Sequence, residues 1–209
     1  MVAIIDYDAG NIKSVQKAIE YLGEEVIITR EPEVILNASR VILPGVGAFG
    51  DAMEKLHKYN LVDVIREVVK REIPFLGICL GLQLLFEKSY EYGEYDGLGF
   101  LKGKVVPIKD YVDASLKIPH IGWNALKFKG EKSPIFKYLK DGDFVYFVHS
   151  YYGANCDESV IADTEYGAYL TAAVARGNVF GCQFHPEKSG TVGLEILRAF
   201  TQLKEETVC

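Results

Sequence analysis

Short apolar runs and amphipathic stretches follow one another along the first part of the chain. Val2–Asp6 is an apolar run that predicts a strand. After it, apolar residues recur at helical spacing, at Ile12, Val15, Ile19 and Leu22. Asn11 is available as the N-cap of this helix and Gly23 as its stop. The pattern predicts a strand, a turn and a helix, in that order.

The same order repeats toward the middle of the chain. Apolar runs at 25–29, 40–44 and 73–78 predict strands, with helical segments at 32–37 and 51–70 between them. These strands are continuously apolar, which is typical of a parallel sheet covered on both faces. We therefore predict an α/β fold with three layers, in which helices cover both faces of a mostly parallel sheet.

The second half of the chain has a different pattern of apolar and polar residues. From 93 to 132, Gly, Pro, Lys and Tyr interrupt short alternating segments such as "GKVVPIK" and "ALKFK", which favours a few antiparallel strands. Further strand-like segments follow, beginning with "DFVYFVHSYYG", and a closing helix carries Ile196, Leu197, Phe200 and Leu203. Because no repeat, low-complexity tract or linker interrupts the sequence, we expect residues 1–209 to form a single domain.

Composition and charge narrow the class of protein. The 209 residues are 49% hydrophobic and 25% charged, as is ordinary for a soluble domain, and the net charge of −6 provides no basic surface for nucleic acid or acidic membranes. The longest apolar stretch, 73–86, contains Gln83 and two glycines and is too short to span a bilayer. The N-terminus lacks the features of a signal peptide, so we expect a cytoplasmic protein.

The chain has four cysteines, at positions 79, 156, 182 and 209. They are scattered, without metal-binding spacing and without a secretory context, so we expect neither a disulfide nor a metal site. Any thiol chemistry would then depend on one cysteine.

Cys79 lies where an apolar strand meets a predicted helix, within Gly77-Ile78-Cys79-Leu80-Gly81. Hydrolases place a nucleophile between two glycines at such a turn, because small neighbours permit a strained backbone and close approach of the substrate. A helix N-terminus also favours the thiolate and offers an amide to an oxyanion. A small cysteine buried at a tight turn is an equally good interpretation of this pentapeptide alone.

A candidate base follows a later apolar strand, in His185-Pro186-Glu187. Pro186 favours an extended conformation at His185, and residues two apart in extended chain project to the same side. Glu187 could therefore hold one nitrogen of the imidazole while the other accepts a thiol proton. By the same alternation, Cys182 should point away from His185. Taken alone, this tripeptide is more typical of a surface turn with a solvated glutamate.

A glycine loop, "LPGVGAFGD" at 43–51, follows another predicted strand. It is placed at the edge where open α/β sheets bind ligands, and could supply a second oxyanion amide. Its glycines could equally be turn residues only. The chain has no glycine-rich phosphate-binding motif of the P-loop or dinucleotide type, so we do not expect nucleotide binding.

Taken together, "PGVGAFGD", "GICLGLQ" and "QFHPEKSG" closely resemble the class I glutamine amidotransferase family. The resemblance covers essentially the whole chain and implies a Cys-His-Glu triad that hydrolyses glutamine, without a cofactor. It implies that Cys79 is the nucleophile, His185 the general base and Glu187 its orienting partner. It further implies oxyanion donors at the amides of Gly47 and Leu80, and glutamine-binding roles for Gln83 and Glu91.

Three further segments, "YDAGN", "PHIGWN" and "YFVHSYY", resemble one branch of that family, the glutaminase subunits of imidazole glycerol phosphate synthases. The resemblance implies that Ser150 and Tyr151 help to bind L-glutamine. It also implies that Asn11, His120 and Trp123 lie near a (β/α)8-barrel synthase subunit. That partner would use the ammonia to form imidazole glycerol phosphate and the aminoimidazole carboxamide ribonucleotide of histidine biosynthesis.

Other interpretations of the sequence remain open. The same glutaminase could serve a different amidating synthase, such as one that amidates a sugar. A cysteine hydrolase without ammonia transfer and a purely binding module are the alternatives from other classes. Several residues also have ordinary structural explanations: His149 and Trp123 suit a core, Glu91 suits a solvated surface, and His57 is expected to be exposed.

Overall fold

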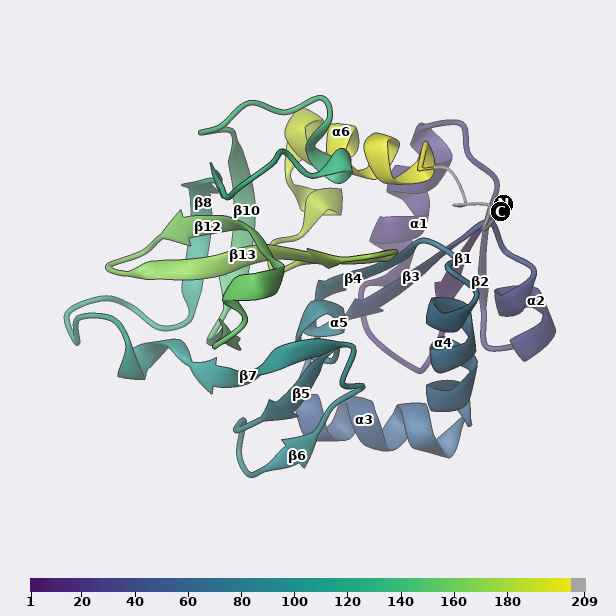
Figure 1. The fold of residues 1–209 in the computed structure, drawn as a ribbon, viewed down its shortest axis with the longest axis horizontal. Helices are drawn as coiled ribbons and strands as arrows, with labels where there is room; N and C mark the ends of the chain where they lie inside the picture. The colour runs from purple at the N-terminus through teal and green to yellow at the C-terminus, as the bar shows by residue number, and fades with distance from the viewer. Residues whose placement is uncertain (204–209) are drawn as a thin grey trace.

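The computed structural model describes residues 1–203 and is built around an eight-stranded sheet with the order β2-β1-β3-β4-β14-β13-β12-β9 (Figure 1). The first five strands in that order are mutually parallel and the last three are antiparallel. The strands are β1 (Val2–Ile5), β2 (Val26–Thr29), β3 (Arg40–Gly45), β4 (Phe75–Cys79), β9 (Lys127–Phe128), β12 (Val160–Glu165), β13 (Tyr169–Arg176) and β14 (Val179–Cys182). The predicted fold class, a mostly parallel sheet with antiparallel strands from the second half, is confirmed.

Helices lie on both faces of this sheet because its central strands are apolar on both sides. In β1, Val2 and Ile4 pack with α1 (Ile12–Tyr21) and α6 (Gly190–Thr201), whereas Ala3 and Ile5 pack with the helices of the other face. Those helices are α2 (Pro32–Leu36), α3 (Phe49–Lys58) and α4 (Leu61–Lys70). Figure 1 shows the resulting three layers. No helix between residues 1 and 203 is long and apolar enough to cross a membrane.

The start of α1 differs from the prediction. Asn11 precedes the helix with a left-handed φ of 65°, and its side chain makes no capping hydrogen bond. Asn11 was expected to be available as an ordinary N-cap, whose side chain bonds to the first free amides of the helix. The amide group of Asn11 reaches instead to a residue 176 positions away.

Two smaller sheets stand beside the main one. β10 (Phe144–His149) pairs with β8 (His120–Ala125), and β11 (Tyr151–Ala154) joins β7 (Leu101–Pro107), β5 (Phe86–Ser89) and β6 (Tyr95–Asp96). The apolar segment around 144–154 therefore divides at Ser150 between two sheets. The remaining elements are α5 (Leu80–Gln83) and four short 3-10 helices, η1 (Ile108–Asp110), η2 (Pro134–Phe136), η3 (Asp157–Ser159) and η4 (Pro186–Lys188).

Candidate active site

Cys79 ends β4 in a strained conformation, with φ 55° and ψ −109°, and α5 begins at the next residue. Few non-glycine residues adopt a positive φ, and the cost is of order 1 kcal/mol or more. The surrounding glycines make the turn possible. A Cβ at Gly81 would lie only 1.9 Å from the carbonyl oxygen of Leu43 on β3. The sequence motif therefore corresponds to a tight strand-to-helix turn that displays the thiol.

His185 comes from the strand next to Cys79. β14 runs parallel to β4, with Cys182 paired to Ile78, so the chain after β14 emerges at the same edge as Cys79. The imidazole is 2% exposed. Burial lowers the pKa of His185, but the hydrogen bond with Glu187 and the charges of Cys79 and Glu187 outweigh it and raise the pKa to about 9. His185 therefore holds a proton at neutral pH.

Glu187 orients the imidazole. Its side chain is fully buried, and its Oε1 lies 2.8 Å from Nδ1 of His185. A carboxylate only accepts, so Nδ1 donates, and Nε2 has no partner among residues 1–203. The turn of η4, and not a continuous extended chain as predicted, brings the two side chains together. In the protonated ring, Nε2 therefore carries the proton that His185 can give to a group bound in the cavity.

A cavity of about 340 Å³ lies in front of Cys79 and His185. Its walls come from segments far apart in the sequence and include six of the other predicted site residues: Gly47, Leu80, Gln83, Glu91, Ser150 and Tyr151. The structure therefore brings the predicted nucleophile, base, oxyanion and glutamine-binding residues together around one space. Their individual roles remain predictions.

Polar side chains at the cavity are hydrogen-bonded to neighbouring groups. Nε2 of Gln83 donates to the carbonyl of Tyr151 at 3.0 Å and to Oε1 of Gln183 at 3.1 Å. Nε2 of Gln183 lies 3.9 Å from the sulfur of Cys79. Gln183 was not predicted as a site residue, although the alternation that turns Cys182 away from His185 places Gln183 on the same side as His185.

Glu91 links the cavity to the glycine loop. Its Oε2 accepts a hydrogen bond from the backbone N–H of Phe49, the first residue of α3, at 2.6 Å. Burial raises the pKa of Glu91, although this hydrogen bond acts in the opposite direction. The alternative of a solvated surface glutamate is wrong, since only 9% of Glu91 is exposed.

The loop that carries Gly47 forms part of the cavity wall. Gly47 has φ +108°, a conformation that favours glycine, and Val46 beside it is exposed. The hydroxyl of Tyr7 donates to the carbonyl of Pro44 at 2.8 Å and holds the base of the loop. Leu80 contributes the first amide of α5, which has no intrahelical acceptor.

The predicted interface residues lie in different environments. Trp123 is half exposed, next to Tyr146 on β10. His120 is fully buried, so its side chain does not form part of an accessible surface. Asn11 is partly buried and donates to Oε1 of Glu187 at 2.8 Å. Their contact with a partner remains a prediction.

His120 is instead part of a buried polar chain. Its Nδ1 lies 2.9 Å from Nε2 of His149, whose Nδ1 lies 2.9 Å from the carbonyl of Tyr151 at the cavity. Burial lowers the pKa of His149 to about 3, so this ring is neutral at physiological pH.

The predicted exposure of His57 is confirmed.

The other cysteines of the described region are not placed for chemistry at the cavity. Cys156 and Cys182 are buried and free, and Cys209 lies outside the described residues. No cluster of three or more histidine, cysteine, aspartate or glutamate side chains that could hold a metal occurs within residues 1–203.

The layered fold, with a cysteine on a strained turn and a buried His-Glu pair at the cavity, is that of a glutamine amidotransferase. The sequence model of the family described as "Glutamine amidotransferase class-I" matches residues 3–203, and this chain belongs to that family. A crystal structure of a glutamine amidotransferase has the same fold, with a TM-score of 0.74 and 22% identity over 97% of this chain and 98% of that one.

Curated relatives identify the branch of the family. The protein of Lactococcus lactis is 52% identical over 96% of this chain and 98% of its own length, and is named "Imidazole glycerol phosphate synthase subunit HisH". The protein of Aquifex aeolicus has the same name and is 53% identical over 97% of both chains. The predicted membership of the class I glutamine amidotransferase family is confirmed.

Proposed function

We propose that this chain is the glutaminase subunit of an imidazole glycerol phosphate synthase. It hydrolyses L-glutamine to glutamate and ammonia. One observation carries the proposal: Glu187 holds Nδ1 of a protonated His185, while the opposite nitrogen is directed to the cavity that Cys79 lines. Residues 1–209 act as one amidotransferase domain in the cytoplasm.

In the first half-reaction, the Cys79 thiolate attacks the carbon of the glutamine side-chain amide. The carbonyl electrons move to oxygen, and the amides of Gly47 and Leu80 donate to the resulting oxyanion. His185 gives its proton to the departing nitrogen. The C–N bond breaks, ammonia leaves, and a thioester joins the glutamyl group to Cys79.

In the second half-reaction, neutral His185 takes a proton from water, which attacks the thioester. The C–S bond breaks, glutamate leaves, and the proton stays on the imidazole opposite the regenerated thiolate. Gln83, Glu91, Ser150 and Tyr151 hold the substrate, since all four line the cavity. The acidic Glu91 suits the α-amino group of glutamine.

The ammonia passes to a (β/α)8-barrel synthase subunit in a heterodimer, which forms imidazole glycerol phosphate and the aminoimidazole carboxamide ribonucleotide. The names of the relatives support a synthase partner. The position of β8 supports the location of the interface. Pro119 lines the cavity just before this strand, and two and four residues later Ile121 and Trp123 are 58% and 51% exposed. Exposed aromatic and aliphatic side chains of this kind serve as interface anchors.

Ammonia release from glutamine tests this function directly. It should be measured with the full chain alone and with candidate barrel synthases supplied with their nucleotide substrate. Stimulation by a barrel partner supports the proposal, whereas capture and stimulation by an unrelated synthase would select a different acceptor. Absence of ammonia release under all of these conditions would contradict the glutaminase function.

A further inference from the structure

The loop from Asp6 to Asn11 contacts both halves of the catalytic apparatus. On one side, Asn11 donates to Glu187 at 2.8 Å. On the other, Tyr7 holds the carbonyl of Pro44, and a Cβ added at Gly10 would approach Val46 to 2.9 Å. One short loop therefore lies between the carboxylate that orients His185 and the glycine loop that carries Gly47.

This loop needs support because its backbone is strained. Asp8 and Asn11 both have a left-handed φ, of 62° and 65°. Non-glycine residues in that region cost of order 1 kcal/mol each and persist only where surrounding contacts hold them. Asn11 gains no capping bond that would offset its own conformation. The contacts that hold the loop must come from elsewhere.

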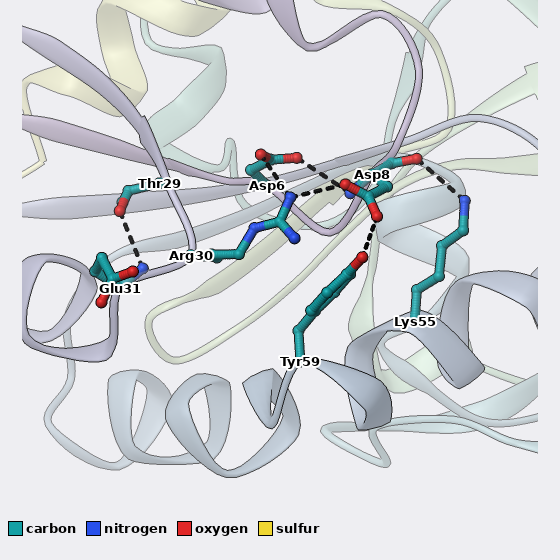
Figure 2. A network of polar contacts seen from close by, with 7 residues as sticks. All are labelled: Asp6, Asp8, Thr29, Arg30, Glu31, Lys55 and Tyr59. Carbon is teal, nitrogen blue, oxygen red and sulfur yellow. Dashed lines mark hydrogen bonds and ion pairs between the residues drawn. The ribbon is translucent and has the colours of Figure 1, made fainter.

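Figure 2 shows those contacts on the outer side of the loop. Nη2 of Arg30, just after β2, lies 2.8 Å from Oδ2 of Asp6 and 2.7 Å from Oδ1 of Asp8. The hydroxyl of Tyr59 donates to the other oxygen of Asp8, and Nζ of Lys55 donates to the Asp8 carbonyl at 3.1 Å. We call these five residues, Asp6, Asp8, Arg30, Lys55 and Tyr59, the Arg30 clamp.

The contacts within the Arg30 clamp are numerous enough to fix the conformation of the Asp6–Asn11 loop. Single exposed ion pairs contribute little, but a network in which several groups hold one residue restricts it more strongly. The hydrogen bonds from Tyr59 and Arg30 lower the pKa of Asp8 and so favour its charged form. The Arg30 guanidinium also lies 4.2 Å from the centre of the Tyr59 ring, which holds these two side chains together.

We propose that the Arg30 clamp is a positioning device for the active site: by fixing the Asp6–Asn11 loop, it keeps the Asn11 amide on Glu187 and thereby fixes the carboxylate that orients His185. This role rests on the proposed glutaminase function. None of the clamp residues lines the cavity, so they act through Asn11 and are positioning residues.

A purely structural clamp would change stability but not the titration of His185. The titratable groups whose charges are coupled to His185 are Cys79 at the end of β4, Glu187 on η4 and His149 on β10. Glu187 contributes to the raised pKa of His185, so a carboxylate that moves away from Nδ1 lowers this pKa. Release of the clamp should therefore shift the titration of His185 to lower pH.

The test measures the rate at which acivicin, an electrophilic glutamine analogue, alkylates Cys79 in the full chain across pH. Arg30→Gln removes the charge that joins Asp6 to Asp8. We expect its rate constant to fall about tenfold, since small displacements of catalytic groups have effects of this order. We also expect the alkaline limb of its pH profile to move to lower pH, and Arg30→Lys to restore part of both properties.

Arg66→Gln is the matched control, because Arg66 forms an exposed ion pair with Asp63 at 3.0 Å on α4, outside the Arg30 clamp. Its rate and profile should equal those of the unmodified chain. A double variant tests the route: Arg30→Gln added to Asn11→Ala should cause little further loss if the clamp acts through Asn11.

The outcomes separate the two proposals. If the unmodified chain is not alkylated at Cys79 and releases no ammonia, the glutaminase function fails. If it reacts and Arg30→Gln reacts at the same rate with the same pH profile, the positioning role is wrong. The same conclusion holds if Arg30→Gln only lowers the midpoint of urea unfolding, or if its effect adds fully to that of Asn11→Ala.

Discussion

Cys79 and Cys182 lie at the ends of neighbouring parallel strands, yet their surroundings differ in every respect that matters for chemistry. Cys79 has a strained backbone, precedes the first amides of α5 and lines the cavity. Cys182 is fully buried in the apolar core, and burial raises the pKa of its thiol far above the usual range. The two thiols therefore differ through the backbone turn and through access to the cavity, since both are cysteines at the ends of neighbouring strands and both border the same apolar cluster.

The largest expected difference is in turnover. Cys79→Ser should reduce glutaminase activity by a factor of about 10⁴ or more, because removal of a nucleophile removes the covalent route. Cys182→Ala is the matched control and should keep most of the activity, measured as ammonia release. Comparable losses in both variants would show that the two thiols are not functionally distinct.

A second difference between Cys79 and Cys182 is that Cys79 shares its cavity with a histidine that Glu187 orients. Glu187→Gln should reduce kcat by about 10³- to 10⁴-fold, since an amide can donate to Nδ1 and favour the wrong tautomer. Glu195→Gln on α6, where Glu195 pairs with Arg198, is the control and should have little effect. Full activity in Glu187→Gln would exclude an orienting role for the carboxylate.

Substitution of Cys182 should change the free energy of unfolding of the protein. Cys182→Ser places a hydroxyl in a fully buried apolar site, and should lower the free energy of unfolding by about 2 kcal/mol. Urea denaturation measures this change, and Cys182→Ala separates the cost of the hydroxyl from that of lost volume. A Cys182→Ser protein as stable as the unmodified chain would contradict the burial of this side chain.

The last expected effect is a pH dependence of stability that comes from His185. The pKa of His185 rises from 6.5 to about 9 in the folded protein, so the folded state binds this proton more tightly than the unfolded state. Its contribution to stability is fully present below pH 6.5 and is lost as the pH rises through about 9.

The contribution of His185 together with its coupled partner Cys79 is measured by comparing urea unfolding of the unmodified chain with that of His185→Asn. Both proteins contain the same Cys182, so its titration cancels in the difference. The difference in stability should shrink between pH 6.5 and 9.5. A difference that stays constant or grows over this range would contradict a raised pKa for His185.

Local sequence pattern was sufficient for much of the sheet. The four apolar runs in the first 79 residues become β1, β2, β3 and β4, and the helical spacing after Asn11 becomes α1. These elements follow from the periodicity of side-chain burial, which is a property of neighbouring residues. The segment 144–154 could not be divided in this way, because its strands separate according to which distant strands they join.

In the active site, too, some features could be predicted from local sequence and others only from the tertiary structure. Motif chemistry singled out Cys79, His185 and Glu187, because a nucleophile between glycines and a histidine near a carboxylate have recognisable local forms. The contact of Gln183 with Cys79 and the burial of His120 against His149 were not predicted. These contacts depend on the order of strands in the sheets, to which local periodicity is insensitive.

The sequence by itself determined the α/β class, because that follows from local periodicity, and three motifs taken together predicted Cys79, His185 and Glu187 as a triad through their family resemblance. Only the tertiary structure decided that Asn11 leaves its helix end to bind Glu187, and that Arg30 and Tyr59 hold the loop between them. The physical reason is that strand order brings together side chains up to 176 positions apart, and the energies of those contacts outweigh local preferences such as helix capping.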